Sequence, residues 1–340
     1  MHNDGQFVVS SSPHIRAEED TRSIMLDVCI ALVFPLIIAV YFFGWRALVL
    51  TIISVASCVF FEWAYRALLK KESSIRDLSA VVTGMLLAFS LSAATPYWLP
   101  VVGAFFAIVV VKQLFGGLGH NFLNPALAAR VFLLSFPTLM NLYPEARPGD
   151  LNLLALWGKL DATTAATPLS ETFMGGGLLP VDQFSVTDLL LGQIPGALGE
   201  VSKLMLLLGG LYLVVRRVIK PRIPLCFMGT VAVLTYLFPL GGQESLDWMV
   251  HQLLSGGLVL GAVFMATDYA TSPVTRRGQY LFGIGCGALT VFIRYFGAFP
   301  EGVSFAILLM NTMVWLLDKA GIPRRFGAGP FAMRRRAKSP

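Results

Sequence analysis

Residues 24–43 read IMLDVCIALVFPLIIAVYFF, an apolar run of twenty residues whose only charged side chain is Asp27. A helix needs about 20 mostly apolar residues to cross a hydrocarbon layer roughly 30 Å thick. The whole chain of 340 residues shares this character, with 56% hydrophobic residues, 14% charged residues and a mean hydropathy of +0.70. Ordinary soluble domains carry about 25% charged residues. The composition therefore excludes an ordinary soluble domain and indicates a multi-pass membrane protein.

The apolar runs of the chain predict ten membrane-spanning helices. They cover residues 24–43, 47–65, 78–95, 97–115, 122–140, 196–215, 223–240, 250–267, 280–296 and 302–317. The fifth run is the least regular, because Asn124, Pro125 and Arg130 interrupt it. We therefore expect an all-α integral membrane protein.

The basic residues predict the orientation of these helices, because Lys and Arg are enriched in short cytoplasmic loops. With a cytoplasmic N-terminus, most of the 26 lysines and arginines fall on the inner side. Both termini are then cytoplasmic: a polar segment, 1–23, and a basic tail, 318–340. The long segment 141–195 falls on the outer side. It separates a first membrane region, 24–140, from a second one, 196–317.

Five predicted helices precede the segment 141–195 and five follow it, which suggests two inverted repeats. Thr83-Gly84 and Ser255-Gly256 each begin an apolar stretch, and similar Phe-Gly sequences occur at residues 115–117 and 296–298. Inverted repeats place a site near the bilayer midplane, where broken helices meet. Residues 115–124 and 268–273 are candidate breaks. Ordinary loops at helix ends explain them equally well.

The outer segment contains the sequence DATTAATPL at residues 161–169. Small residues that end in a hydroxyl before a proline predict an extended, exposed strand that can enter the active site of another enzyme. Asp161, Thr164 and Thr167 in this order resemble the flavinylation motif of the D subunits of Rnf complexes. The B subunit of the sodium-pumping NADH:quinone oxidoreductase has a related motif. Ala165 stands where these proteins usually have glycine.

Further stretches extend the resemblance to the Rnf D subunits over nearly the whole chain. They are SSSPHIR at 10–16, NPA at 124–126, GQIPG at 192–196, FMATDYATSPVT at 264–275 and GVSFA at 302–306. They occur in the order found in the family. The short N-terminal extension resembles the D subunits more than the quinone-reductase B subunits.

The resemblance implies a membrane subunit of an ion-translocating ferredoxin:NAD oxidoreductase in a prokaryotic inner membrane. A flavin transferase would link FMN through its phosphate to Thr167, with Asp161 and Thr164 as further residues of the cofactor site. The flavin would exchange electrons with the covalently flavinylated G subunit, coupled to Na⁺ or H⁺ translocation. Related proteins hold a second, noncovalent flavin such as riboflavin.

The sequence predicts no site for NAD, metal or nucleic acid in this chain. No nucleotide-binding fingerprint or catalytic triad is present, so NAD would bind another subunit. The four cysteines lack the spacing of metal ligands. They lie in apolar runs, where a buried thiol is the usual state. They are also too few for a disulfide-stapled domain.

Ionisable side chains within predicted spans are candidates for function, because they are costly in hydrocarbon. These are Asp27, Glu62, Lys112, Arg130, Glu200, Lys203, His251 and Asp318. Glu200 and Lys203 are three residues apart, so we expect them to face and neutralise each other. Glu200 and Asp268 are our hypothesis for the ion path.

A second class of function fits the same helices. Ten helices in an inverted repeat also form secondary transporters and channel-like proteins, which need no redox cofactor. The segment 161–167 distinguishes the two interpretations, since a transporter does not need a flavinylation motif.

Overall fold

The computed structural model describes residues 20–72, 74–140, 142–144, 166–174, 185–297 and 299–321. Regular structure in these residues is helical, and their only strand-like pairing is an isolated bridge between Ser92 and Ala197. The prediction of an all-α chain is therefore confirmed for this part of the molecule. Asp161 and Thr164 lie outside the described residues.

The first half of the chain starts with two long helices joined by a single residue. Asp20 caps the first helix, and Gly44, with a φ of +70°, ends it and lets the second begin at once. The elements are α1 (Thr21–Phe43), α2 (Trp45–Leu68), η1 (Ile75–Asp77), α3 (Ser79–Phe89), α4 (Trp98–Phe105), the π-helix η2 (Phe106–Gln113), α5 (Pro125–Leu133) and α6 (Pro137–Met140).

The second half contains two short helices followed by a second series of apolar helices. The short ones are α7 (Pro168–Met174) and α8 (Val186–Leu191). After them come η4 (Leu198–Glu200), α9 (Lys203–Val215), α10 (Arg222–Leu237), α11 (Ser245–Leu254), α12 (Leu258–Leu260), the π-helix η5 (Gly261–Met265), α13 (Arg276–Phe296), α14 (Val303–Thr312) and α15 (Val314–Gly321).

By length and composition, α1 and α2 can each cross a membrane. Two bent pairs raise the number of candidate spans to four: α11 with Leu258–Met265, bent by 64°, and α14 with α15, bent by 59°. Other predicted spans are shorter than expected, since α3 ends at Phe89 and α9 begins only at Lys203. The described residues thus contain two to four candidate membrane spans, and the count of ten remains a prediction.

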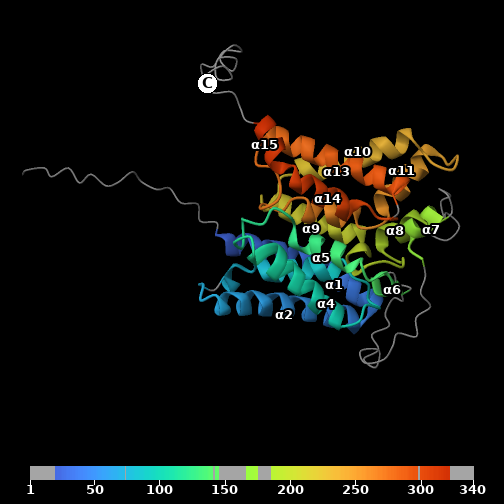
Figure 1. Cartoon of the computed structure of the whole chain (residues 1–340). Coiled ribbons are helices and arrows are strands. Elements are labelled where there is room, and N and C mark those ends of the chain that lie inside the picture. The colour runs from blue at the N-terminus through green and yellow to red at the C-terminus, as the bar shows by residue number, and fades with distance from the viewer. Residues whose placement is uncertain are drawn as a thin grey trace, which may run out of the picture.

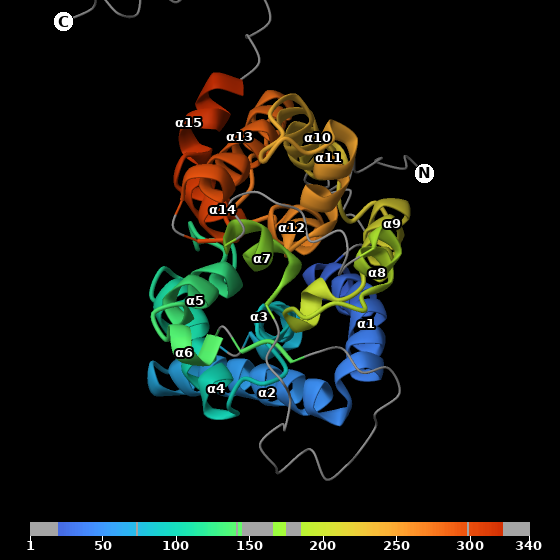
Figure 2. The same cartoon turned by 90° about the vertical axis from the view of Figure 1, so that its right-hand side faces the viewer.

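The helices form one bundle in which both halves of the chain share an interface (Figures 1 and 2). The halves meet where α1 packs on α9 and where α5 packs on α14. A Cβ on Gly209 of α9 would lie only 2.6 Å from the Ala31 carbonyl oxygen of α1, so this contact needs glycine. Figure 1 shows the start of α1 and the end of α15 at one end of the bundle and α6, α7 and α8 at the other.

The non-helical segments differ in part from those the sequence suggested. The segments 114–124 and 266–275 do separate helices, as expected. However, the interruptions inside the predicted spans lie at 90–97 and at 255–257. Thr83-Gly84 lies within α3, whereas Ser255-Gly256 lies in a break, so the two similar sequences occupy different structures. Glycine alone did not locate the breaks.

Candidate functional site

Thr167 directly precedes α7 and caps its start. Its Oγ1 accepts a hydrogen bond from the Ser170 amide at 3.2 Å and donates one to the Ser170 hydroxyl at 3.0 Å. Pro168 takes the first helical position, which suits its fixed φ and missing N–H. Threonine, proline and serine in this order therefore define a helix start. The expected extended strand stops before Pro168; residues 161–165 of it lie outside the described residues, and Thr167 is non-helical and half-buried.

Leu169 anchors α7 to the rest of the protein. Its side chain is 5% exposed, although it follows Thr167 by only two residues. A Cβ on Gly256 would lie 3.2 Å from Leu169 Cδ2, so Leu169 sits against the bend at residues 255–257. Gly256 has a φ of +68°, which favours glycine at this point of the bend.

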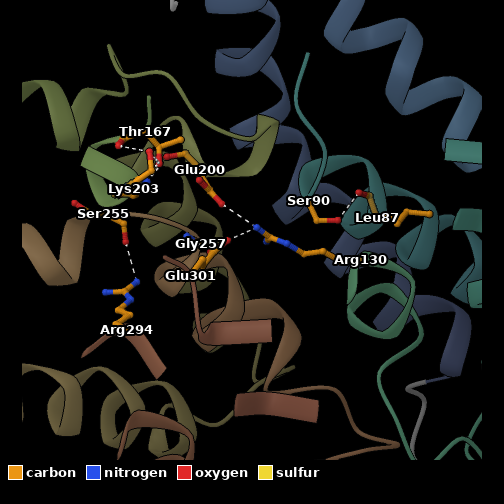
Figure 3. A network of polar contacts seen from close by, with 11 residues as sticks. Leu87, Ser90, Arg130, Thr167, Glu200, Lys203, Ser255, Gly257, Arg294 and Glu301 are labelled. Atoms are coloured by element: carbon orange, nitrogen blue, oxygen red, sulfur yellow. Dashed lines mark hydrogen bonds and ion pairs between the residues drawn. The ribbon is translucent and has the colours of Figure 1, made fainter. Parts of the chain in front are cut away.

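A buried cluster of charged side chains surrounds this bend (Figure 3). The Arg130 guanidinium forms ion pairs with Glu200, at 3.3 Å, and with Glu301. Glu301 Oε1 also accepts a hydrogen bond of 2.6 Å from the Gly257 amide. The cluster thus joins α5, η4, the residues before α14 and the bend.

The expected pairing of Glu200 with Lys203 is found in a different form. The Lys203 ammonium donates to the backbone carbonyl oxygen of Glu200, while the Glu200 carboxylate pairs with Arg130. Lys203 is the first residue of α9, and Glu200 precedes that helix. The two side chains therefore do not stand one helical turn apart on a common helix face. The sequence spacing was correct, but the assumed helix does not extend to Glu200.

Arg294 holds the bend from its other side. Its guanidinium donates to the Gln252 carbonyl oxygen at 2.6 Å, to Gln252 Oε1 at 3.0 Å and to the Ser255 carbonyl oxygen at 3.1 Å. These carbonyls are left without helical partners where α11 ends, so a buried guanidinium is a suitable donor.

Sequence analysis missed Glu301 and Arg294 as members of this site. Arg294 lies inside the predicted span 280–296 but was not among the ionisable candidates, and Glu301 falls between this span and the next one, 302–317. The available signal was that Glu301 directly precedes the GVSFA stretch at 302–306.

A second buried charge cluster lies near the end of α2. The Lys112 ammonium is 2.9 Å from Glu62 and donates to the Ser79 hydroxyl at 2.6 Å. The other Glu62 oxygen accepts hydrogen bonds from Gln113, at 2.9 Å, and from Ser74, at 2.5 Å. All these groups are partnered, which is the condition for burying charges at tolerable cost.

The remaining ionisable candidates have mainly structural contacts. Asp27 accepts hydrogen bonds from Tyr212 at 2.8 Å and from Arg216 at 3.2–3.3 Å. Asp318 accepts from the backbone just before α13 and so holds the start of that helix. His251 is buried on α11.

A cavity of about 80 Å³ lies between the two halves, near the ends of η2 and η5. Its polar lining includes Lys112, Asn121, Asn124 and Asp268. Asn124 caps α5 and donates to the Met265 carbonyl oxygen at 3.2 Å, which connects the start of α5 to the end of η5. Asp268 accepts a hydrogen bond from the Thr271 hydroxyl at 3.1 Å.

These features define a class of protein: a multi-pass helical membrane protein with two buried ion-pair clusters, one of which joins its halves. The chain belongs to the NQR2, RnfD, RnfE family, whose model matches residues 8–327.

Several curated relatives are similar over nearly their full length. The chain is 47% identical over 328 residues to the D subunit of the Na⁺-translocating ferredoxin:NAD⁺ oxidoreductase complex of Acetobacterium woodii, covering 96% of each chain. It is 39% identical over 336 residues to the D subunit of the proton-translocating complex of Clostridium ljungdahlii, covering 94% of this chain and 96% of that one. The D subunit of the ion-translocating oxidoreductase complex of Escherichia coli SE11 is 37% identical over 350 residues, with 94% and 98% covered. These relatives are named as subunits of a multi-subunit, ion-translocating redox enzyme.

Proposed function

We propose that this chain is the D subunit of an ion-translocating ferredoxin:NAD oxidoreductase complex and carries a covalent FMN on Thr167. The observation that carries the proposal is the position of Thr167. It is the last residue of the sequence that resembles a flavinylation motif, and it directly precedes a helix whose Leu169 contacts the bend beside the buried charge cluster. The relatives named as D subunits support the assignment to the complex.

The residues around Thr167 are compatible with a phosphate ester. Its Oγ1 can still accept the Ser170 N–H bond after esterification, because only the donated hydrogen bond is lost. The charge cluster against which α7 is anchored contains three basic residues and two acidic ones, so its formal charge does not oppose a phosphodiester anion. The basic members are Arg130, Lys203 and Arg294, and the acidic members are Glu200 and Glu301.

FMN, when bound, supplies transfer of one or two electrons, and the protein supplies position and surroundings. Here Pro168 and Leu169 fix the attachment point close to the helix bundle. A tethered flavin cannot dissociate, which suits a relay to the flavin of the G subunit. Asp161 and Thr164 belong to the segment that a flavin transferase would recognise. NAD and ferredoxin would bind other subunits.

We propose ten membrane crossings in two inverted repeats, comprising 24–140 and 196–317. The contacts between halves support this, since α1 with α9 and α5 with α14 pair elements at corresponding positions of each half. The ends of the described chain lie at one end of the bundle and α7 at the other. With both termini cytoplasmic, Thr167 would be on the outer side.

A second, noncovalent flavin such as riboflavin remains a further proposal. The cavity lined by Asn121 and Asn124 offers hydrogen-bonding groups, but its volume of about 80 Å³ is small. Small-molecule sites usually have about 300–1,000 Å³. A flavin would bind there only if the two halves moved apart.

In-gel flavin fluorescence of the denatured chain, co-expressed with a flavin transferase, tests the main proposal. We expect fluorescence and an FMN-phosphate mass increment in the wild type and their loss in Thr167→Val. Asp161→Ala and Thr164→Val should lower the yield, whereas Thr163→Val, outside the motif positions, should not. An unmodified wild type beside a modified control substrate would refute the proposal.

The cavity between the halves, whose mostly apolar lining includes Lys112 and Asp268, favours one alternative, a secondary transporter or channel-like protein. In that case, vesicles containing the chain alone would show solute or ion flux, and the Thr167→Val chain would behave like the wild type.

A further inference from the structure

The bend at residues 255–257 connects the charge cluster to the segment that carries Thr167. A Cβ on Gly256 would contact both Leu169 Cδ2, at 3.2 Å, and Glu301 Oε1, at 3.5 Å. The amide of the next residue, Gly257, donates to the same Glu301 oxygen at 2.6 Å. One carboxylate therefore contacts the same short stretch of backbone as Leu169, and Figure 3 shows Glu301 beside Gly257.

Glu301 is itself held in a defined orientation. One of its carboxylate oxygens accepts from Gly257, and the other pairs with Arg130, whose guanidinium also pairs with Glu200. Its side chain is 19% exposed. A largely buried carboxylate with partners on both oxygens has little freedom to reorient, so it can fix the bend to α5.

The connection from the bend to Thr167 is short and stiff. Leu169 and Pro168 are both buried, and the proline ring fixes one of the few backbone torsions between Leu169 and Thr167. The Ser170 amide and hydroxyl bind the Thr167 side chain at 3.2 Å and 3.0 Å. A shift of the bend is thus transmitted to the Thr167 hydroxyl.

We propose that Glu301 is a positioning residue for the attachment threonine. By accepting the Gly257 hydrogen bond, it keeps the bend 255–257 in the form that receives Leu169, and so determines where Thr167 presents its hydroxyl. This inference rests on the proposed function only for its biological meaning. The mechanical relationship between Glu301 and α7 can be measured without FMN.

The test uses a nitroxide attached to the full-length chain after Ala166→Cys, in a background in which the four native cysteines are replaced. Ala166 adjoins Thr167 and takes no part in the helix cap, so the label leaves the Thr167 hydrogen bonds in place. Electron paramagnetic resonance then reports how strongly the segment is immobilised. Leu169→Ala is the positive control, since it removes the anchor and should release the label.

Glu301→Ala should convert most of the immobilised signal to a mobile one. Glu301→Gln keeps an oxygen that can accept the Gly257 hydrogen bond, so it should restore the immobilised signal. Asp318→Ala removes a carboxylate of similar structural importance near the start of α13 and should leave the spectrum unchanged. This control separates positioning from general loss of stability.

The proposal is overturned if Glu301→Ala leaves the label immobilised while Leu169→Ala releases it. It is equally overturned if Glu301→Gln releases the label as fully as Glu301→Ala does. Absence of covalent flavin on the wild-type chain would refute the proposed function alone, because the nitroxide signal does not depend on FMN.

Discussion

The Lys112 ammonium lies 2.9 Å from the Glu62 carboxylate, and these side chains expose only 2% and 0% of their surface. Lys112→Met should therefore destabilise the protein strongly, because it leaves Glu62 buried without its counter-ion. The expected loss is about 3–5 kcal/mol of unfolding free energy. Unfolding of the purified chain in detergent, followed by denaturant titration, measures it.

Two comparisons define the outcome for this pair. The double variant Glu62→Gln with Lys112→Met should recover much of the loss, since no unpaired charge remains. Arg216→Met breaks the pair between the exposed Arg216 and the buried Asp27, and it should shift the unfolding midpoint less than Lys112→Met does, because Asp27 keeps its Tyr212 hydrogen bond. Equal destabilisation by the single and double variants would show that the charge is not the cause.

Gly257→Ala should disrupt the charge cluster around Arg130. The added Cβ would lie 2.5 Å from Glu301 Oε1 and 3.3 Å from Glu200 Oε1, and neither carboxylate can move without losing an ion pair. Thermal unfolding should show a lower midpoint. Gly229→Ala is the matched control, because its Cβ would meet no atom within 4 Å and alanine favours the helix by about 1 kcal/mol. A Gly257→Ala chain as stable as wild type would contradict the observed packing.

Thr167→Val should loosen α7 as well as prevent flavin attachment. Loss of the cap costs about 0.5–2 kcal/mol, so hydrogen exchange at the Ser170 amide should become faster. Thr167→Ser retains a hydroxyl acceptor and should keep the slow exchange. If the serine and valine variants exchange alike, the Thr167 hydroxyl does not act as the cap.

The ion path can be tested at Glu200 and Asp268. In proteoliposomes containing the assembled complex, Asp268→Asn should lower ion translocation more than electron transfer, because Asp268 lines the cavity between the halves. Glu200→Gln should do likewise if Glu200 belongs to the path, and intact pumping would remove it from the hypothesis. Asp318→Asn is the control, because Asp318 binds the backbone just before α13 and belongs neither to the cavity nor to the Arg130 cluster.

The helical elements were largely predictable, because apolar runs long enough for a membrane rarely form anything else. The predicted spans 24–43 and 280–296 correspond to α1 and α13. The interruptions were not predictable in the same way. Gly84 lies in a helix at a close helix contact, where an added Cβ would come within 2.6 Å of Val55 Cα. Gly256 instead lies in a bend and has a positive φ. The same residue type serves both purposes.

The candidate site was predicted at Thr167 and missed at Glu301. A motif of neighbouring residues marks Thr167, so local sequence was sufficient. Arg130 and Glu301 are 171 residues apart, and no spacing rule relates them. Their pairing depends on how α5 and α14 pack, which only the three-dimensional structure shows.

The order in which the Arg130 cluster is synthesised has a consequence for maturation. Arg130, Glu200 and the Gly257 amide enter the growing chain before Glu301, so the last carboxylate emerges after α13 has been made. Until then Arg130 has only Glu200 as an acidic partner, and the Gly257 amide has no carboxylate to bind. A nascent chain released before Glu301 would therefore contain Thr167 and its recognition segment but lack part of the surface that receives Leu169. Biogenesis is thus expected to place complete insertion of the second half before stable presentation of the threonine, which orders translation ahead of the proposed attachment of FMN.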